Sequence, residues 1–158
     1  PLPTGQRGGR KWFDLRAPDG PTQVLERVQD LHGLVQDLKT RYPGAPRPIL
    51  LGFSQGAMLS LQMLARHPRD LGGVVALSGF LPVNEGNVTT GEPIPALLTM
   101  GVHDHRVTPE HTRAAADALR SLGHQPEEVI FDGGHAVPRE IMDRVRQFIR
   151  KVALTPTP

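Results

Sequence analysis

Two kinds of apolar pattern alternate along the chain. Apolar residues spaced three or four apart predict helices, and they occupy four segments: from Pro21 to the proline-rich stretch 43–48, then 56–66, 109–122 and 140–152. Short runs rich in apolar residues lie between these segments, at 48–53, 73–77, 94–102 and 128–131. Such runs are typical of strands buried on both faces, so the alternation predicts an α/β fold with a mostly parallel sheet and helices on both faces.

The remaining stretches predict irregular chain at the edges of this fold. Residues 1–20 are rich in glycine, proline and arginine, which favours an irregular lead-in anchored by Trp12 and Phe13. Glycines and prolines over 82–93 predict a long surface loop, and residues 154–158 a frayed tail. The sequence has no internal repeat and no low-complexity linker, so residues 1–158 are interpreted as a single domain.

The amino-acid composition narrows the classes of protein to which this chain could belong. The 158 residues are 38% apolar and 22% charged, values typical of soluble globular proteins, and no apolar run approaches the roughly 18 residues of a membrane span. Eighteen basic side chains oppose 16 acidic ones, and aromatic residues make up only 4%, which disfavours a nucleic-acid-binding groove. The absence of cysteine excludes disulfides, thiolate metal sites and a cysteine nucleophile.

The N-terminal segment carries no pattern of a secretion signal, which needs a basic region followed by an apolar region and small residues. We expect a cytoplasmic protein. The first residue is Pro1 rather than methionine, so the sequence leaves open whether residues precede it.

Candidate chemistry begins at the pentapeptide from Gly52 to Gly56, which reads G-x-S-x-G after one predicted strand and before a predicted helix. A sharp turn here would expose the Ser54 hydroxyl at the carboxyl end of the strand, and the small Gly52 and Gly56 would allow close packing. The backbone N–H of Gln55, at the helix start, would face an oxyanion formed on a substrate. The alternative is an ordinary turn in which Ser54 caps the helix.

Two further side chains would activate such a serine. A serine hydroxyl is a poor nucleophile until a base takes its proton, and the base needs a carboxylate that fixes its tautomer. Asp104 follows the predicted strand 94–102, and His135 follows the predicted strand 128–131. Parallel strands end at one edge of a sheet, where ligands bind. We therefore interpret Ser54 as the nucleophile, Asp104 as the acid and His135 as the base.

Other chemically active side chains have simpler interpretations. A cluster around the candidate acid could be interpreted as a metal site: His103, Asp104, His105 and His111. Adjacent residues at a strand end point to opposite sides, however, so we predict no metal site there. His135 could be an ordinary loop histidine, and Asp132 is a rival acid that we interpret as a turn residue. Three histidines on helices or helix ends are expected at the surface: His32, His67 and His124.

Several segments together resemble a known family: Gly52-Phe53-Ser54-Gln55-Gly56-Ala57-Met58, Leu77-Ser78-Gly79, Gly101-x-x-Asp104-x-x-Val107 and Gly134-His135-x-x-Pro138. They are similar to the carboxylesterase, phospholipase and acyl-protein thioesterase family of α/β hydrolases, and Trp12-Phe13-Asp14 resembles that family's segment upstream of the serine. The similarity runs from about residue 10 to 150. It implies the same roles for Ser54, Asp104 and His135, without a metal or organic cofactor. Thr108 stands where the family often has proline.

The main departure from the family lies on the N-terminal side. The family begins with further strands and a His-Gly-x-Gly loop that supplies one of two oxyanion N–H groups, and nothing in this sequence resembles that loop. We expect a chain without the N-terminal quarter of the fold, which keeps the Gln55 N–H as one donor; loss of a donor costs about 10²–10³ in turnover. Strand 49–53 would have an unpaired apolar edge, which predicts a homo-oligomer that covers it.

These observations predict a serine hydrolase that cleaves carboxylic esters through an acyl-enzyme on Ser54. Short acyl chains are favoured because nothing resembles a large mobile lid, and the resemblance also allows lysophospholipids and protein thioesters as substrates. The alternative is a truncated, weakly active or non-catalytic remnant that serves as an interaction module. The set of Ser54, Asp104 and His135 argues against the remnant, whereas the missing oxyanion loop argues for it.

Overall fold

Helices and strands alternate along the chain as the apolar pattern predicts. The computed structural model describes residues 2–3, 10–82 and 92–154. The elements follow in the order β1 (Leu2–Pro3), β2 (Arg10–Lys11), α1 (Gly20–Arg41), β3 (Ile49–Phe53), α2 (Gln55–Arg66), the 3-10 turn η1 (Pro68–Asp70), β4 (Gly73–Leu77), β5 (Ala96–Gly101), α3 (Pro109–Ser121), β6 (Pro126–Phe131) and α4 (Arg139–Leu154). From α1 onward, the observed bounds lie within two residues of the predicted ones, and the α/β fold class is confirmed.

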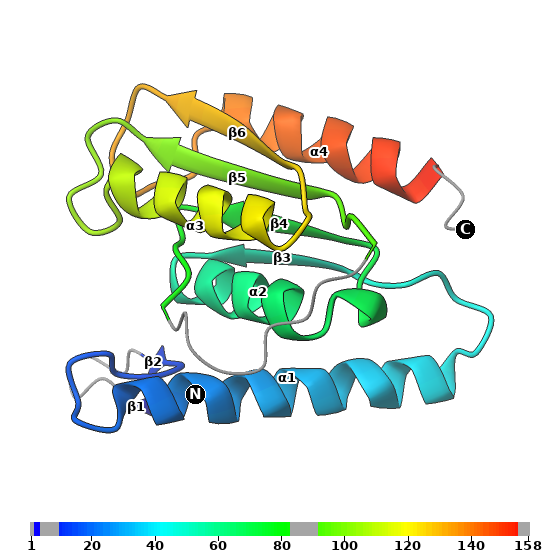
Figure 1. The fold of residues 1–158 in the computed structure, drawn as a ribbon. Coiled ribbons are helices and arrows are strands. Elements are labelled where there is room, and N and C mark those ends of the chain that lie inside the picture. Colours follow the sequence, from blue (N-terminus) through cyan, green and yellow to red (C-terminus); the bar gives the residue numbers. More distant parts are fainter. Residues whose placement is uncertain (1, 4–9, 83–91, 155–158) are drawn as a thin grey trace.

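The strands from β3 to β6 form one parallel sheet, in the order β3-β4-β5-β6. Residues 49–53 pair with 73–77, and residues 96–101 pair with 126–131. The two central strands, β4 and β5, are buried along their whole length because they have a strand on each side and helices on both faces. Figure 1 shows α2 and α3 over one face and α4 over the other, with α1 packed outside α2.

The alternation of side chains along β4 divides the core into two parts. Val74 and Ala76 point to one face, where they pack with apolar residues of α1, α2 and α3. Val75 and Leu77 point to the other face, where they pack with three residues of α4: Ile141, Val145 and Phe148. Because both faces are covered, the carboxyl ends of the strands form a rigid edge from which loops can present side chains.

The outer side of β3 forms an open edge. No strand pairs with this side among residues 2–3, 10–82 and 92–154, and Leu51 and Phe53 are 49% and 41% exposed. The unpaired apolar edge that the sequence predicts for 49–53 is therefore present in the described part of the chain.

The irregular stretches differ in part from expectation. Within 1–20, expected to be irregular, β1 and β2 pair as antiparallel strands. Phe13 is fully buried but Trp12 is 45% exposed, so of these two residues it is Phe13 that anchors the segment by burial. Most of the expected loop 82–93 and tail 154–158 lies outside the described residues, and Leu154 is the last residue of α4. Of the helices that are described, none has the length and apolarity to cross a membrane.

The expectation of three surface histidines is wrong. His124 is 1% exposed; its Nδ1 accepts a hydrogen bond from the Ile94 N–H at 3.2 Å, and burial lowers the pKa of its imidazole. His32 and His67 are half-buried, and their rings stack with centroids 3.7 Å apart. Helical spacing could not show this, because the contact depends on how α1 packs against the end of α2.

Candidate active site

The turn from β3 into α2 places Ser54 in a strained backbone conformation. Its φ is 54° and its ψ is −116°, in a region that side chains other than glycine rarely adopt. Hydrogen bonds hold the turn: the Ser54 N–H donates to the Leu77 carbonyl at 2.9 Å, and the Met58 N–H donates to the Ser54 carbonyl at 3.0 Å. The Ser54 hydroxyl makes no cap hydrogen bond to α2, so the interpretation of Ser54 as a helix cap is wrong.

Gly52 makes this turn sterically possible. A Cβ on Gly52 would lie 2.2 Å from the carbonyl carbon and oxygen of Gly56 and 2.5 Å from the Ala57 nitrogen, distances that real Cβ atoms essentially never show. At Gly56 a Cβ would meet no atom within 4 Å. The expectation that both glycines permit close packing is therefore correct for Gly52 and wrong for Gly56, whose backbone is the surface that Gly52 approaches.

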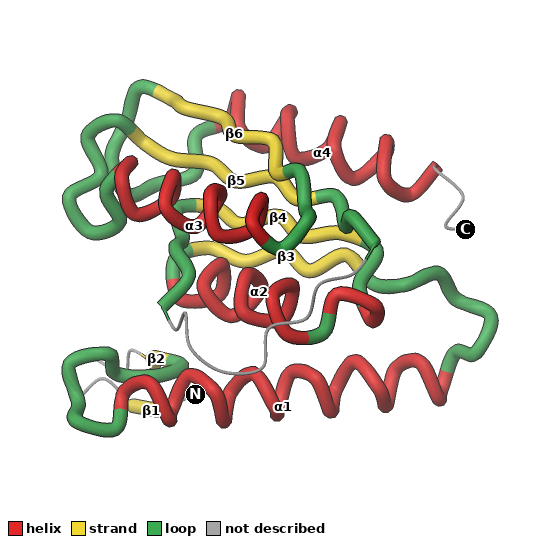
Figure 2. The backbone as a smooth tube through the Cα atoms, viewed as in Figure 1, coloured by secondary structure: helices red, strands yellow, loops and turns green. Residues whose placement is uncertain are grey.

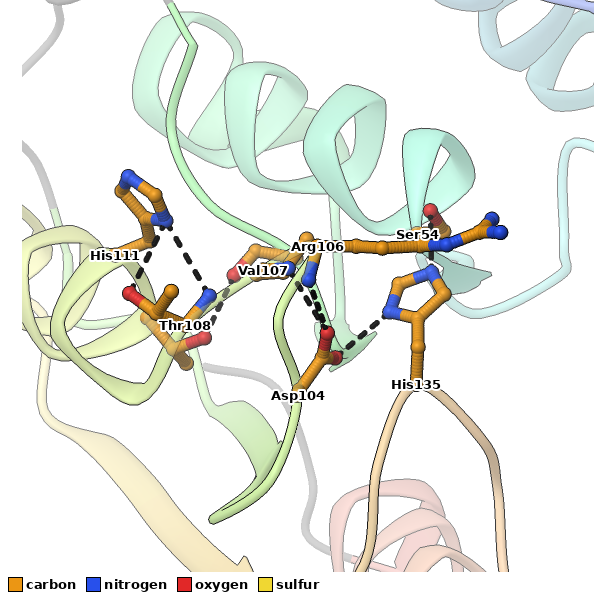
Figure 3. A network of polar contacts seen from close by, with 9 residues as sticks. Ser54, Asp104, Arg106, Val107, Thr108, His111 and His135 are labelled. Atoms are coloured by element: carbon orange, nitrogen blue, oxygen red, sulfur yellow. Dashed lines mark hydrogen bonds and ion pairs between the residues drawn. The ribbon is translucent and has the colours of Figure 1, made fainter.

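The side chains of Ser54, His135 and Asp104 form one hydrogen-bonded chain (Figure 3). The Nε2 atom of His135 lies 2.9 Å from Ser54 Oγ, and its Nδ1 atom lies 2.7 Å from Asp104 Oδ2. A proton on Nδ1, donated to the carboxylate, leaves the Nε2 lone pair free to accept the Ser54 O–H. The three candidates, predicted from separate parts of the sequence, are thus in contact.

The aspartate is held by the loop that carries it. Its Oδ1 atom accepts hydrogen bonds from the backbone N–H groups of Arg106 and Val107, at 2.8 and 2.9 Å, and the side chain is fully buried. Burial alone would raise the pKa of Asp104, but the hydrogen bonds from Val107, His135 and Arg106 outweigh it and keep this pKa below its ordinary value. Asp104 is therefore a carboxylate at neutral pH, aimed at His135.

Close contact between two loops brings the histidine to the aspartate. A Cβ on Gly101, the last residue of β5, would lie 2.4 Å from the Gly133 carbonyl oxygen and 2.6 Å from that of Gly134. The loop of His135 thus rests directly on the backbone before Asp104, and the His103 N–H donates to the Gly133 carbonyl at 2.9 Å. These loops gather at the carboxyl end of the sheet, next to the turn after β3 (Figure 2).

Two residues of the site have supporting contacts that sequence reasoning missed. The ring of Phe53 lies against the imidazole of His135, with centroids 4.8 Å apart and planes tilted by 39°. The side chain of Gln55 accepts a hydrogen bond from the Trp12 N–H at 2.8 Å and donates one to the Phe13 carbonyl at 2.9 Å. No local signal could reveal the Gln55 contacts, because they join residues more than 40 positions apart.

The other candidate ligands and acids have different partners. Asp132 is exposed and its Oδ1 lies 3.0 Å from His103 Nε2, away from the bond between His135 and Asp104. His111 lies in the first turn of α3, where its Nδ1 accepts a hydrogen bond from the Thr108 N–H at 3.3 Å. Within the described residues, the histidines around Asp104 form no cluster of metal-ligating atoms with it.

The lowered pKa of Asp104 predicts a pH-dependent contribution to stability. An aspartate with a lower pKa in the folded than in the unfolded state stabilises the fold above its unfolded value of about 3.8, and this stabilisation is lost as the pH falls through the folded value. Between about pH 5 and pH 3, we expect the free energy of unfolding to fall more steeply in the wild type than in Asp104→Asn. Urea unfolding across this range measures both slopes, and equal slopes would contradict the prediction.

The fold and the hydrogen-bonded serine define a class of protein. A serine lifted by a tight strand-to-helix turn, followed in chain order by an acid and a histidine at the same sheet edge, is the arrangement of α/β hydrolases. Within that class, the chain belongs to the phospholipase/carboxylesterase family, whose family model matches residues 2–153. The family resemblance of the sequence is thereby confirmed.

The relatives of this chain include proteins named as carboxylesterases and as thioesterases. Carboxylesterase SOBER1 of Arabidopsis thaliana is 25% identical over 154 residues, which are 90% of this chain and 68% of that protein. Its crystal structure matches with a TM-score of 0.78 and 25% identity, over 91% of this chain and 74% of that chain. Acyl-protein thioesterase 1 homolog 1 of Dictyostelium discoideum is 31% identical over 150 residues, 89% of this chain and 66% of that protein. A protein of Oryza sativa subsp. japonica, named as a probable inactive carboxylesterase, is 28% identical over 156 residues, 89% of this chain and 62% of that protein. The chain thus spans about two thirds of the length of these curated relatives.

Proposed function

We propose that the protein is a serine hydrolase that cleaves carboxylic esters through an acyl-enzyme on Ser54. Membership of the phospholipase/carboxylesterase family supports an esterase-type hydrolase. The single observation that carries the finer proposal is the continuous hydrogen-bonded chain from Ser54 through His135 to Asp104. Without it, a serine at a strand-to-helix turn would be an unactivated alcohol.

The geometry supports a two-step reaction. His135 Nε2 takes the proton as Ser54 Oγ attacks the acyl carbon, and the carbonyl electron pair moves to its oxygen. When the tetrahedral intermediate collapses, His135 returns the proton to the leaving alcohol and the acyl group stays on Ser54. A water molecule then gives a proton to His135 as its oxygen attacks the acyl carbon. When this second tetrahedral intermediate collapses, the bond to Ser54 Oγ breaks, His135 returns the proton to Oγ, and the carboxylic acid is released. Asp104 stabilises the imidazolium in both steps.

The oxyanion would be stabilised by the start of α2. The N–H groups in the first turn of a helix have no intrahelical partner and carry a partial positive charge. Gln55 is the first residue of α2 and follows Ser54 directly, so its N–H is proposed as a donor to the oxyanion. The side-chain hydrogen bonds of Gln55 to the backbone at Trp12 and Phe13 fix the residue in place.

The substrate class within the carboxylic esters is proposed to be short acyl esters. A series of p-nitrophenyl esters, from acetate to palmitate, tests this directly, since the leaving group is constant and only the acyl chain varies. Highest kcat/KM on acetate or butyrate supports the proposal. A maximum at long chains would instead favour lysophospholipids or protein thioesters as natural substrates.

A non-catalytic protein that serves as an interaction module is the second candidate. The observation that favours it is that one relative, 28% identical to this chain, is itself named as a probable inactive carboxylesterase. The two candidates differ in the reactivity of Ser54, which hydrolysis assays of Ser54→Ala and labelling with a fluorophosphonate measure.

We further propose that two copies of the chain associate through the open edge of β3. Leu51 on this edge is 49% exposed, and it borders an apolar cavity of about 400 Å³ between β3, α1 and α2, lined also by Trp12, Leu34 and Leu50. An exposed apolar edge strand is a template for pairing with another strand. Its counterpart in the second copy is identical, so antiparallel pairing of the two β3 strands would cover both edges.

A lysine on this edge should abolish the association. We expect the wild type to be a dimer at micromolar concentration in sedimentation velocity, and Leu51→Lys to be a monomer, because a charge on the edge opposes strand pairing. Ile130→Lys is the matched control, since Ile130 is equally exposed (49%) but lies on β6, at the opposite edge of the sheet. A monodisperse wild-type monomer, or dissociation by Ile130→Lys instead, would contradict the proposal.

The cytoplasmic location and the single domain over 1–158 stay predictions.

A further inference from the structure

A second cluster of chemically active side chains lies at the far end of α2. His32 of α1, His67 at the end of α2 and Asp70 of η1 each offer one ligand atom, and these atoms all lie within 4.8 Å of one another. All three residues are half-buried. Because α2 has 12 residues and rises about 1.5 Å per residue, this cluster is about 18 Å from Ser54 along the helix. It therefore takes no part in the site described above.

Hydrogen bonds within the protein do not satisfy this cluster. The Nε2 atom of His67 is buried and has no hydrogen-bond partner in the described structure. The Nε2 atom of His32 lies 2.9 Å from both Asp70 Oδ2 and the Gln36 amide nitrogen. One ring nitrogen cannot donate to a carboxylate and accept from an amide at the same time. The His32 Nε2 atom can therefore satisfy only one of its two neighbours, and the buried His67 Nε2 has no partner in the described structure.

Asp70 supplies the negative charge that a cation in this cluster would contact. The Asp70 Oδ1 atom accepts a hydrogen bond from Lys39 Nζ at 2.6 Å, which leaves Oδ2 for the histidines. Burial would raise the pKa of Asp70, but hydrogen bonds from Lys39, Gln36 and His32 lower it to about 2, so the group is a carboxylate at neutral pH. Lys39 and Arg66 are the positive charges that oppose a cation here.

We propose that His32, His67 and Asp70 bind one divalent transition ion of the Zn²⁺ type. Two imidazole nitrogens and one carboxylate oxygen are a donor set that Zn²⁺ accepts, with water in the fourth position, whereas Mg²⁺ and Ca²⁺ prefer oxygen ligands alone. Tetrahedral ligands at about 2.05 Å from Zn²⁺ lie about 3.3 Å apart. The rings of His32 and His67, now stacked within 12° of parallel, would rotate apart so that both Nε2 atoms face the ion.

Such an ion would join α1 to the end of α2. His32 lies in the middle of α1, whereas His67 and Asp70 follow α2 directly, so the three bonds would cross-link elements 35 positions apart in sequence (His32 to His67). The consequence is stabilisation of the folded chain in proportion to the free ion concentration, because the unfolded chain has no preformed site.

The test is titration of the untagged, chelator-treated chain with ZnCl₂, followed by calorimetry and thermal unfolding. We expect uptake of one Zn²⁺ per chain and a rise in Tm of about 5–10 °C at a free concentration 100 times Kd. His32→Ala and His67→Ala should each weaken binding at least about 10-fold and remove the Tm shift measured against their own metal-free forms. His105→Ala, which replaces an exposed histidine outside the cluster, should bind as the wild type does.

Two other metal ions, tested together with the His32→Ala and His67→Ala variants, show which ions bind and where they bind. MgCl₂ should leave Tm unchanged, and CoCl₂ should give the visible absorption of a four-coordinate Co²⁺ that both cluster variants lose. Zn²⁺ binding that survives in both variants would place the ion elsewhere and overturn the proposal. So would a wild type that binds Zn²⁺ more weakly than about 100 μM.

Discussion

Ser54→Ala should lose esterase activity completely while keeping the fold. We expect hydrolysis of p-nitrophenyl acetate to fall to the rate of buffer alone, a loss of at least about 10³-fold, because the substitution removes the hydroxyl that lies 2.9 Å from His135 Nε2. The substitution removes one oxygen at a half-buried position, and the Ser54 hydroxyl makes no cap hydrogen bond to α2. Stability should therefore change little.

The matched control is Ser121→Ala. Ser121 is exposed at the end of α3, where its hydroxyl donates to the Ala118 carbonyl at 2.7 Å, so its loss should leave kcat/KM unchanged. Equal rates in the wild type and Ser54→Ala would mean that the hydrogen-bonded chain exists without acting as a nucleophilic site, and the interaction-module candidate would then be favoured.

Gly52→Ala should disrupt the turn that carries Ser54. Its Cβ would overlap the backbone of Gly56 and Ala57, at 2.2 and 2.5 Å, and backbone atoms cannot move aside as a flexible side chain can. We expect a loss of about 3 kcal/mol or more in the free energy of unfolding, at the upper end of overpacking effects. The urea midpoint of unfolding measures this loss, with the slope m as a check on two-state behaviour.

Gly56→Ala, four residues away, should leave the free energy of unfolding unchanged or raise it slightly. Its Cβ would meet no atom within 4 Å, and alanine is favoured over glycine in a helix by up to about 1 kcal/mol. We therefore expect Gly56→Ala to be as stable as the wild type or slightly more so. Similar midpoints for the two variants would contradict the packing that the turn requires.

The elements and the candidate triad could be predicted because their signals are local. Each strand and helix has its own apolar period, and the position of Ser54, Asp104 and His135 within a few residues of a strand end follows from sequence order alone. Parallel pairing then brings the three strand ends to one edge. The role of Gly52 was visible in the motif, whereas the open space at Gly56 was not.

Contacts between distant segments could not be predicted in this way. His124 becomes buried because its ring accepts a hydrogen bond from the Ile94 N–H, 30 residues away. His32 and His67 meet only because α1 packs along α2. The hydrogen bond between the Gln55 side chain and the Trp12 N–H likewise depends on how distant segments pack together. A single sequence shows which face of a helix is apolar, but it does not show what that face meets.

The central claim is that His135 activates Ser54, and covalent labelling with a fluorophosphonate tests it most directly. The reagent reacts with activated serines and needs little of the acyl pocket. The chain has four serines, and the exposed Ser121 serves as an internal unactivated control. We expect mass spectrometry to find one adduct on Ser54 in the folded chain, lost in His135→Gln and after heat denaturation. A folded chain without an adduct, or with equal labelling of Ser54 and Ser121, would contradict the account.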